Sequence, residues 1–350
     1  MRKIFGVLTT VFFLYQSAEA ANKVQLAYPD PAGHFITFPL AAKKGLFKDE
    51  GLDVEVTRMG TRVAGLAIGS GELGYFISIG ASVQAAVGGL PFKVMASYVP
   101  AMFVLVARPE FKSVQELKGK TIGVSVIGAT PHIIARMMVK HFGLDPEKDM
   151  QFVNTGGPEG RLAKQYQGMT AATVVPVPVD LVGKKMGFII LARSNDIFSY
   201  PEGGLIVNAK KIKETPDEIK RVIMAGIKAN RYIRANREGT IQFMMEWQKI
   251  DREMAAGAYA SLVQAANVDG SLPERGLRLV IDEAKKAIQR TREVSLSDVE
   301  DLSILREAQR ELGIKAEQSK QSKMVGEVKV SLVYAGPLRV PCRRVSPERC

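Results

Sequence analysis

The segment Glu116–Ser125, which reads ELKGKTIGVS, combines residue types that are used in two kinds of active site. Gly119-Lys120-Thr121 resembles the end of a phosphate-binding loop. That motif requires another glycine at position 114, which is Val114 here, and it follows a strand and opens a helix. Lys120 instead precedes the apolar run 121–124, which predicts a strand. We therefore exclude a nucleotide-binding loop.

The same segment holds the first half of the serine-hydrolase motif Gly-x-Ser-x-Gly, at Gly123 and Ser125. Ile127 stands where the second glycine belongs. The chain has three histidines, and none is placed to complete a catalytic triad with this serine. Ser125 is therefore not predicted to be a nucleophile.

A third glycine-rich segment, residues 69–74 (GSGELG), matches the spacing of a dinucleotide-binding loop. It ends a predicted helix and leads into a strand, so we interpret its glycines as a helix C-cap and a turn. Paired metal-ligand spacing is absent, since His132 and His141 lie far apart on one predicted helix. The sequence predicts no catalytic residue, metal site or cofactor.

The formal net charge is +12, from 48 basic and 36 acidic residues. The basic residues are dispersed and often stand beside acids, as in residues 282–286 (DEAKK), so we expect a solvated basic surface and no nucleic-acid binding. The two cysteines, Cys342 and Cys350, lie close to the end of the chain. The body of the protein therefore uses neither disulfides nor thiol chemistry.

The first twenty residues have the parts of a secretory signal peptide. Arg2 and Lys3 are basic, residues 4–15 form an apolar run, and Ala18-Glu19-Ala20 favours cleavage before Ala21. The run is too short to span a bilayer, which needs about 20 residues. No cysteine follows the cleavage site, which excludes a lipid anchor there. We expect a soluble protein that is exported to the periplasm or the extracellular space.

The remaining chain contains the same pattern twice, over residues 24–96 and 121–192. Each copy reads strand, loop, helix, strand, glycine, helix, glycine, strand, helix, glycine, strand. Strands that alternate with helices indicate parallel sheets covered on both faces, so two such copies predict two α/β lobes. We divide the chain into a signal peptide (1–20), a first part of lobe 1 (21–107), lobe 2 (108–200), a return to lobe 1 with C-terminal helices (201–315) and a flexible basic tail (316–350).

In open α/β sheets, ligands bind beyond the carboxyl ends of the strands, where helix N-termini point backbone N–H groups inward. The loops at those positions come from both lobes and are rich in glycine, hydroxyl and aromatic residues, which suits a clamp around a small molecule. The candidate ligand-binding residues are Tyr28, Asp30, His34, Gly80, Ser82, Tyr98, Ser125, Thr130 and Pro176. Asp30 and His34 suit a ring nitrogen or an amine, whereas bare helix N-termini at Ser82 and Thr130 suit an anion.

Four segments resemble a known family. They are residues 38–55 (FPLAAKKGLFKDEGLDVE), 113–123 (SVQELKGKTIG), 142–146 (FGLDP) and 89–94 (GLPFKV). Together they resemble the solute-binding proteins of ABC importers of the nitrate, sulfonate or taurine type and of the thiamine-pyrimidine-precursor type. The resemblance spans about residues 24–315. It implies a two-lobe periplasmic-binding fold (type II) with a ligand cleft between the lobes. It also implies a monomer that delivers its solute to an ABC permease in the membrane.

Two positions depart from that family, in which an acidic residue usually follows the glycine before a central strand of each lobe. This chain has Gly74 in the first lobe, and it has Ala171 in the segment 168–172 of the second.

Two other functions stay open beside transport. One is an enzyme related to the pyrimidine-precursor synthases, which use clustered cysteines and histidines that this chain lacks. The other is an exported ligand-sensing module, which a neighbouring sensor-kinase gene would distinguish from transport.

Overall fold

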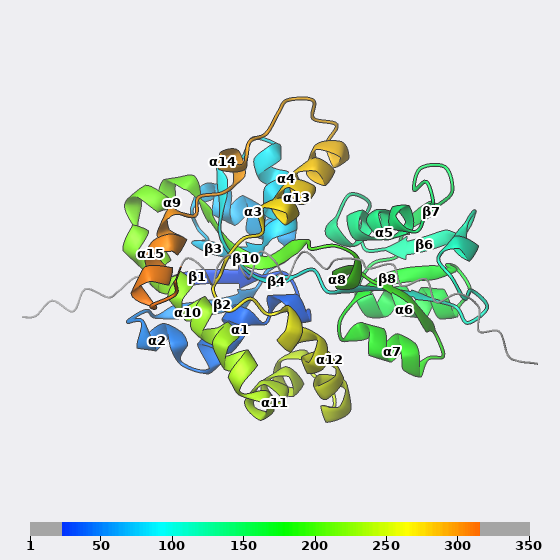
Figure 1. Ribbon diagram of the computed structural model, residues 1–350, viewed down its shortest axis with the longest axis horizontal. Coiled ribbons are helices and arrows are strands. Elements are labelled where there is room, and N and C mark those ends of the chain that lie inside the picture. Colours follow the sequence, from blue (N-terminus) through cyan, green and yellow to red (C-terminus); the bar gives the residue numbers. More distant parts are fainter. Residues whose placement is uncertain (1–22, 316–350) are drawn as a thin grey trace, which may run out of the picture.

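The computed structural model describes residues 23–315, which form two α/β lobes, each built on one five-stranded sheet (Figure 1). The strands are β1 (Val24–Tyr28), β2 (Val54–Arg58), β3 (Tyr75–Ser78), β4 (Phe92–Pro100), β5 (Phe103–Ala107), β6 (Thr121–Val124), β7 (Gln151–Asn154), β8 (Ala172–Pro176), β9 (Ile189–Arg193) and β10 (Pro201–Asn208). Central strands such as β3, β5 and β8 are buried along their whole length because both faces of their sheet are covered.

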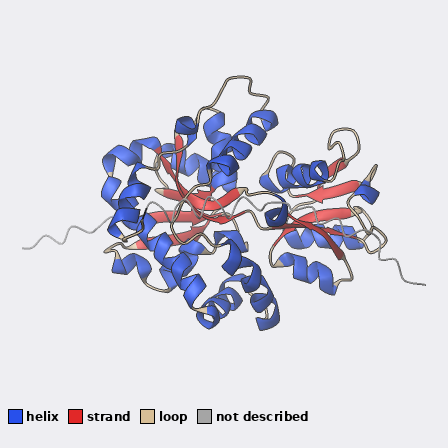
Figure 2. Ribbon diagram, viewed as in Figure 1, coloured by secondary structure: helices blue, strands red, loops and turns tan. Residues whose placement is uncertain are grey.

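Helices lie on both faces of each sheet (Figure 2). The first lobe carries α1 (Thr37–Lys43), α2 (Leu46–Asp49), α3 (Thr61–Ser70), α4 (Ile79–Val87), α9 (Ala209–Glu214), α10 (Pro216–Ala235), α11 (Arg237–Gln248), α12 (Arg252–Ala265), α13 (Glu274–Ala287), α14 (Leu296–Val299) and α15 (Ser303–Glu311). The second lobe carries α5 (Thr130–His141), α6 (Pro158–Tyr166), α7 (Val179–Lys185) and α8 (Ser194–Ile197). Short 3-10 turns occupy Gly33–Phe35 and Gln115–Leu117.

The two sheets have the same topology. Their strand orders are β2-β1-β3-β10-β4 and β7-β6-β8-β5-β9. In each, the first three strands in this order are parallel, and the fourth runs antiparallel to both of its neighbours. The internal repeat that the sequence predicts is therefore present as repeated sheet topology.

The fourth strand of each sheet arrives by a crossing between the lobes. The chain leaves the first sheet after β4 and enters the second as β5, and it leaves the second lobe after α8 and enters the first sheet as β10. β5 pairs with β8 and β9, so residues 103–107 lie in the second sheet and not in the first part of lobe 1. The apolar runs of β4 and β5 follow each other almost directly, which hides the change of sheet in the sequence.

The two positions where family acids are missing lie at the opposite strand ends from the candidate ligand-binding loops. Gly74 directly precedes β3 and Ala171 directly precedes β8, at the amino ends of these strands. The candidate residues Gly80 and Pro176 lie at the opposite, carboxyl ends. Within residues 23–315, no helix is long and apolar enough to cross a membrane, and no cluster of side chains is suited to hold a metal ion.

Two adjacent glycines let β10 fit into the first sheet. A Cβ atom on Gly203 would stand 1.8 Å from the carbonyl oxygen of His34, and one on Gly204 would stand 2.3 Å from Ile79 Cδ1 and 2.5 Å from the carbonyl oxygen of Ala96. The His34 oxygen belongs to the buried 3-10 turn and the Ala96 oxygen to β4, and backbone atoms in such packed elements have little freedom to move. Residues 203 and 204 therefore have to be glycine.

We expect the substitution Gly203→Ala to lower the free energy of unfolding by roughly 3 kcal/mol or more, because the new methyl group overlaps a backbone oxygen. Urea denaturation followed by circular dichroism measures the change. Gly157→Ala is the matched control, since a Cβ there meets nothing within 4 Å and the φ of −64° is allowed for alanine. Equal stability of the two variants would contradict the close fit around β10.

Candidate ligand-binding site between the lobes

The loop after β1 carries three of the predicted site residues. Tyr28 ends β1 and is held by α11, where Trp247 Nε1 donates a hydrogen bond of 3.2 Å to its hydroxyl and the two rings lie 5.6 Å apart. Asp30 follows and accepts a bond of 2.9 Å from the backbone N–H of Ala32, which fixes the turn. The loop is therefore rigid on the first-lobe side of the interlobe boundary.

His34 is buried against that boundary. Its ring packs on Phe35 and on Phe103 of β5, with centroid distances of 4.3 and 5.2 Å. Burial lowers the pKa of His34 to about 3, so the ring is neutral at physiological pH. Its Nδ1 atom has no hydrogen-bond partner within residues 23–315. His34 thus packs between the lobes as an apolar ring and not as a cation.

The amino end of α4 is already occupied by a carboxylate from β10. Glu202 is 2 % exposed. Its carboxylate accepts a hydrogen bond of 2.9 Å from the hydroxyl of Ser78 and one of 3.2 Å from the backbone N–H of Gly80. Helix N-termini attract anions, and here the anion is a side chain of the protein. The sequence predicted a bare N-terminus at residues 80–82. That interpretation is wrong for the first lobe, because Glu202 fills the position.

Burial raises the pKa of Glu202 to about 7, against the lowering effect of its bonds from Ser78 and Gly80, and the charge of Asp30 raises it further. Burial also raises the pKa of Asp30, which Arg58 and Arg161 counteract. Two partly desolvated carboxylates therefore face the same region from the first lobe. When these carboxyl groups are ionised, their negative charge makes a bound anion unfavourable there.

The second lobe meets this group through Thr130, the first residue of α5. A methyl group on Gly80 would stand 2.7 Å from Glu202 Oε2, 2.8 Å from Thr130 Oγ1 and 3.2 Å from the hydroxyl of Tyr200. Gly80 therefore lets the amino ends of α4 and α5 approach each other across the boundary. Thr130 does not cap its helix, as the N-cap position belongs to Ala129, so its hydroxyl is available to the interlobe region.

Arg161, in the first turn of α6, is the basic residue that the second lobe contributes. It is 2 % exposed, its Nη1 donates 2.9 Å to the carbonyl oxygen of Gly156, and its Nε has no partner in the described part of the chain. Burial lowers the pKa of Arg161 to about 10, whereas the charges of Asp30 and Glu159 raise it. Arg161 thus opposes Asp30 electrostatically from the other lobe.

Further contacts between the lobes surround this region. The backbone N–H of Gly33 donates 3.2 Å to the carbonyl oxygen of Val177, which directly follows the predicted residue Pro176 at the end of β8. On α7, Lys185 forms ion pairs of 3.3 Å with Asp251 and with Glu253 at the start of α12. Ser125 follows β6 directly and is half-buried at the same edge of the second sheet.

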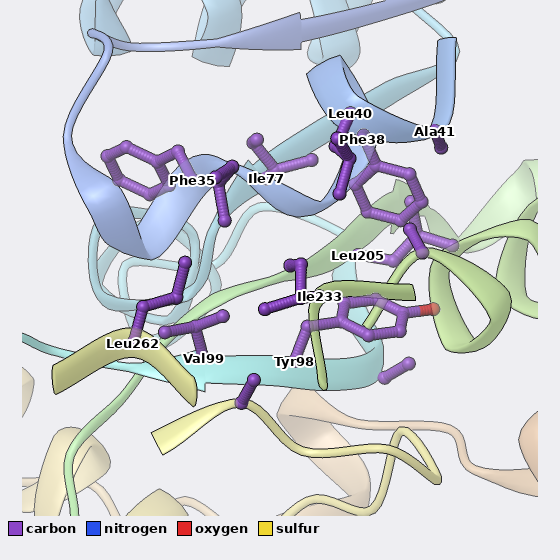
Figure 3. Close-up of a cluster of buried hydrophobic side chains, with 14 of the residues drawn as sticks. Phe35, Phe38, Leu40, Ala41, Ile77, Tyr98, Val99, Leu205, Ile233 and Leu262 are labelled. Atoms are coloured by element: carbon purple, nitrogen blue, oxygen red, sulfur yellow. The ribbon is translucent and has the colours of Figure 1, made fainter. Parts of the chain in front are cut away.

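Tyr98 does not join the interlobe group. Its ring packs in the core of the first lobe, edge-on to Phe38 at 5.2 Å, and its hydroxyl donates 3.2 Å to the carbonyl oxygen of Ile223 (Figure 3). The side chain is fully buried among apolar neighbours, so we leave Tyr98 out of the proposed site. Ser82 lies one turn inside α4 and is also buried.

Sequence reasoning found Asp30 and Thr130 but missed three other polar residues of the region, Glu202, Arg161 and Tyr200. Glu202 carried a usable signal, since it is a single acid within an otherwise uncharged strand and next to two glycines. Arg161 carried a weaker one. It lies one helical turn from Gln165, and both are buried on one face of α6.

Comparisons with known proteins assign the chain to a family. The family model described as NMT1/THI5 like matches residues 33–239. The chain belongs to the NMT1/THI5-like family. A relative from Brucella abortus, named as a binding protein, is 28 % identical over 261 residues, which cover 72 % of this chain and 80 % of the relative. A relative from Brucella melitensis matches to the same extent.

Solved structures share the fold of this family member. The periplasmic nitrate-binding protein from Synechocystis has a TM-score of 0.71 at 17 % identity, over 85 % of this chain and 90 % of that one. A periplasmic sulfonate-binding protein from Methylobacillus flagellatus has a TM-score of 0.70 at 15 % identity, over 84 % and 96 % of the two chains. The expected two-lobe periplasmic-binding-protein fold is confirmed.

The burial of Glu202 predicts a pH dependence of stability. The pKa of Glu202 is about 7 in the folded protein, above the ordinary value of 4.5 in the unfolded chain. Its contribution to the free energy of unfolding is therefore fully present below pH 4.5 and is lost as the pH rises through about 7. We expect this group to lower the unfolding free energy of the wild type by roughly 3 kcal/mol between pH 4.5 and pH 8, and Glu202→Gln to abolish that decrease.

Chemical denaturation of both proteins at several pH values measures this effect. The difference between wild type and variant cancels the opposite pH dependence of His34, whose lowered pKa favours stability at higher pH. The gap in unfolding free energy between variant and wild type is expected to move in favour of the variant as the pH rises. A gap that stays constant from pH 4.5 to pH 8 would show that Glu202 is not buried as described.

Proposed function

We propose that this protein is the exported solute-binding receptor of an ABC importer, which binds a small organic solute between its lobes and delivers it to a membrane permease. The observation that carries the proposal is the interlobe group of Asp30, Glu202, Thr130 and Arg161, contributed by both lobes. Membership of the NMT1/THI5-like family and relatives named as binding proteins support it. Export through residues 1–20 is part of the proposal.

A binding role fits these residues better than catalysis does. Residues 23–315 contain no cysteine, so neither lobe itself supplies a thiol nucleophile to the boundary. His34 is neutral and packed between aromatic rings, which leaves it unsuited to general acid–base work. Hydrogen-bonding groups at a closing boundary are what a receptor needs to hold a solute without changing it.

The charges support a solute that carries hydrogen-bond donors towards the first lobe. Nitrate-binding and sulfonate-binding proteins share the fold, yet here Glu202 fills the amino end of α4 and Asp30 adds a second carboxylate. A small anion placed against these groups would meet like charge in a poorly solvated region. An amine or a ring N–H would meet acceptors, and an acidic group on the same solute would face Arg161.

A thermal-shift panel with the purified protein at pH 8 tests the proposal. The panel holds nitrate, methanesulfonate, taurine, aminopyrimidines and aromatic acids. We expect an amine-bearing organic compound to raise the melting temperature, because a ligand at about 100 times its Kd adds roughly 2.7 kcal/mol of stability. Nitrate and methanesulfonate are expected to cause no shift.

Ser125→Ala and Thr130→Ala are expected to weaken that binding by about tenfold each while leaving the fold intact, as for one lost hydrogen bond. Ser70→Ala is the control, because the Ser70 hydroxyl bonds its own helix α3 at the end away from the cleft. Isothermal titration calorimetry measures the affinities. Unchanged affinity in both variants would show that the solute does not bind at these residues. A panel without any stabilising compound would contradict solute binding itself.

A further inference from the structure

The crossing between β4 and β5 is built from two buried residues, Ala101 and Met102. At this point the backbone changes sheets, so its polar groups lose the regular strand partners that satisfy them elsewhere. The second crossing lies beside it, and the backbone N–H of Ala101 donates 2.7 Å to the carbonyl oxygen of Tyr200. The carbonyl oxygen of Met102 accepts 3.0 Å from the backbone N–H of Val177 in the second lobe.

Two further backbone groups of the crossing are satisfied by one side chain. The Ser194 hydroxyl donates a hydrogen bond of 2.7 Å to the carbonyl oxygen of Ala101 and accepts one of 3.0 Å from the backbone N–H of Phe103. Ser194 begins α8 in the second lobe and is 0 % exposed. A hydroxyl can both donate its proton and accept a hydrogen bond, and these two bonds use Ser194 in both roles.

Any rotation of one lobe against the other has to change the backbone angles near these crossings, because only these segments connect the two sheets within residues 23–315. Such a change moves the carbonyl oxygen of Ala101 relative to the N–H of Phe103. The Ser194 hydroxyl can satisfy both only at one separation. Breaking either bond leaves a buried polar group without a partner, which is unfavourable.

We propose that Ser194 is a positioning residue that sets the angle between the lobes. It acts through the crossing, and the approach of Gly80 to Thr130 depends on that angle. The interlobe hydrogen bond from Gly33 to Val177 depends on the same angle, since Val177 is bonded to Met102 of the crossing. The role of Ser194 is independent of which solute the protein takes.

The test uses the distance between the lobes, measured by pulsed electron paramagnetic resonance on paired spin labels. Labels are placed at Leu66→Cys in the first lobe and Tyr166→Cys in the second, which are both 71 % exposed, after replacement of Cys342 and Cys350 by serine. We expect Ser194→Ala to shift the distance and to broaden its distribution by about twofold. Ser194→Thr, which keeps the hydroxyl, is expected to restore the wild-type distribution.

Thr240→Val is the matched control, because the fully buried Thr240 hydroxyl also donates 2.7 Å to a backbone oxygen, that of Asn236, but lies in α11 away from the crossings. This variant is expected to lower the melting temperature without changing the distance distribution. A Ser194→Ala distribution identical to that of the wild type would overturn the proposal, as would an equal broadening in Thr240→Val.

A measurement on the wild-type protein covers the case in which Ser194→Ala does not fold. The backbone N–H of Phe103 donates its hydrogen bond to the Ser194 hydroxyl, so its hydrogen exchange reports on that bond directly. We expect this amide to exchange at least about a hundredfold more slowly than an unbonded amide. Rapid exchange at Phe103, with slow exchange at other amides of β5, would show that Ser194 does not hold the crossing.

Discussion

The close packing around β10 is the constraint on which the rest of the molecule depends. β10 lies between β3 and β4, and the glycines at 203 and 204 let it pass within contact distance of the backbone of His34 and Ala96. A strand that fits this tightly has one register, so the residue before the glycine pair has one position. That residue is Glu202, and the register therefore places its carboxylate at the amino end of α4.

The electrostatics of the interlobe boundary follow from this placement. A carboxylate that is held by the protein's own N–H and hydroxyl donors needs no bound anion to satisfy α4. The like charge of Asp30 nearby and the opposite charge of Arg161 across the boundary polarise the region, with acids on the first lobe and a base on the second. The common fold thus presents different chemistry from that expected of a site for simple anions.

Much of the architecture was predictable from local patterns, because glycines and apolar runs mark helix ends and strands independently of distant residues. Gly71, for example, ends α3 in the left-handed conformation that its position in the sequence indicates. The exchange of β5 and β10 between the lobes was not predictable in this way, since nothing local distinguishes β5 from a continuation of β4. The burial of Glu202 depends on Ser78 and Gly80, more than a hundred positions away, so the site was predicted only as a set of loops.

The crossing of the chain between the sheets also bears on the order of folding. All strands of the second sheet lie within residues 103–193, so this lobe is complete in one continuous stretch. The first sheet contains β1 to β4 and is complete only when β10 is added, and β10 follows the whole of the second lobe in the chain. Closing that long loop costs entropy, and the second lobe reduces the cost if it is already compact and holds the two ends together. The second lobe can therefore fold before the first sheet is complete.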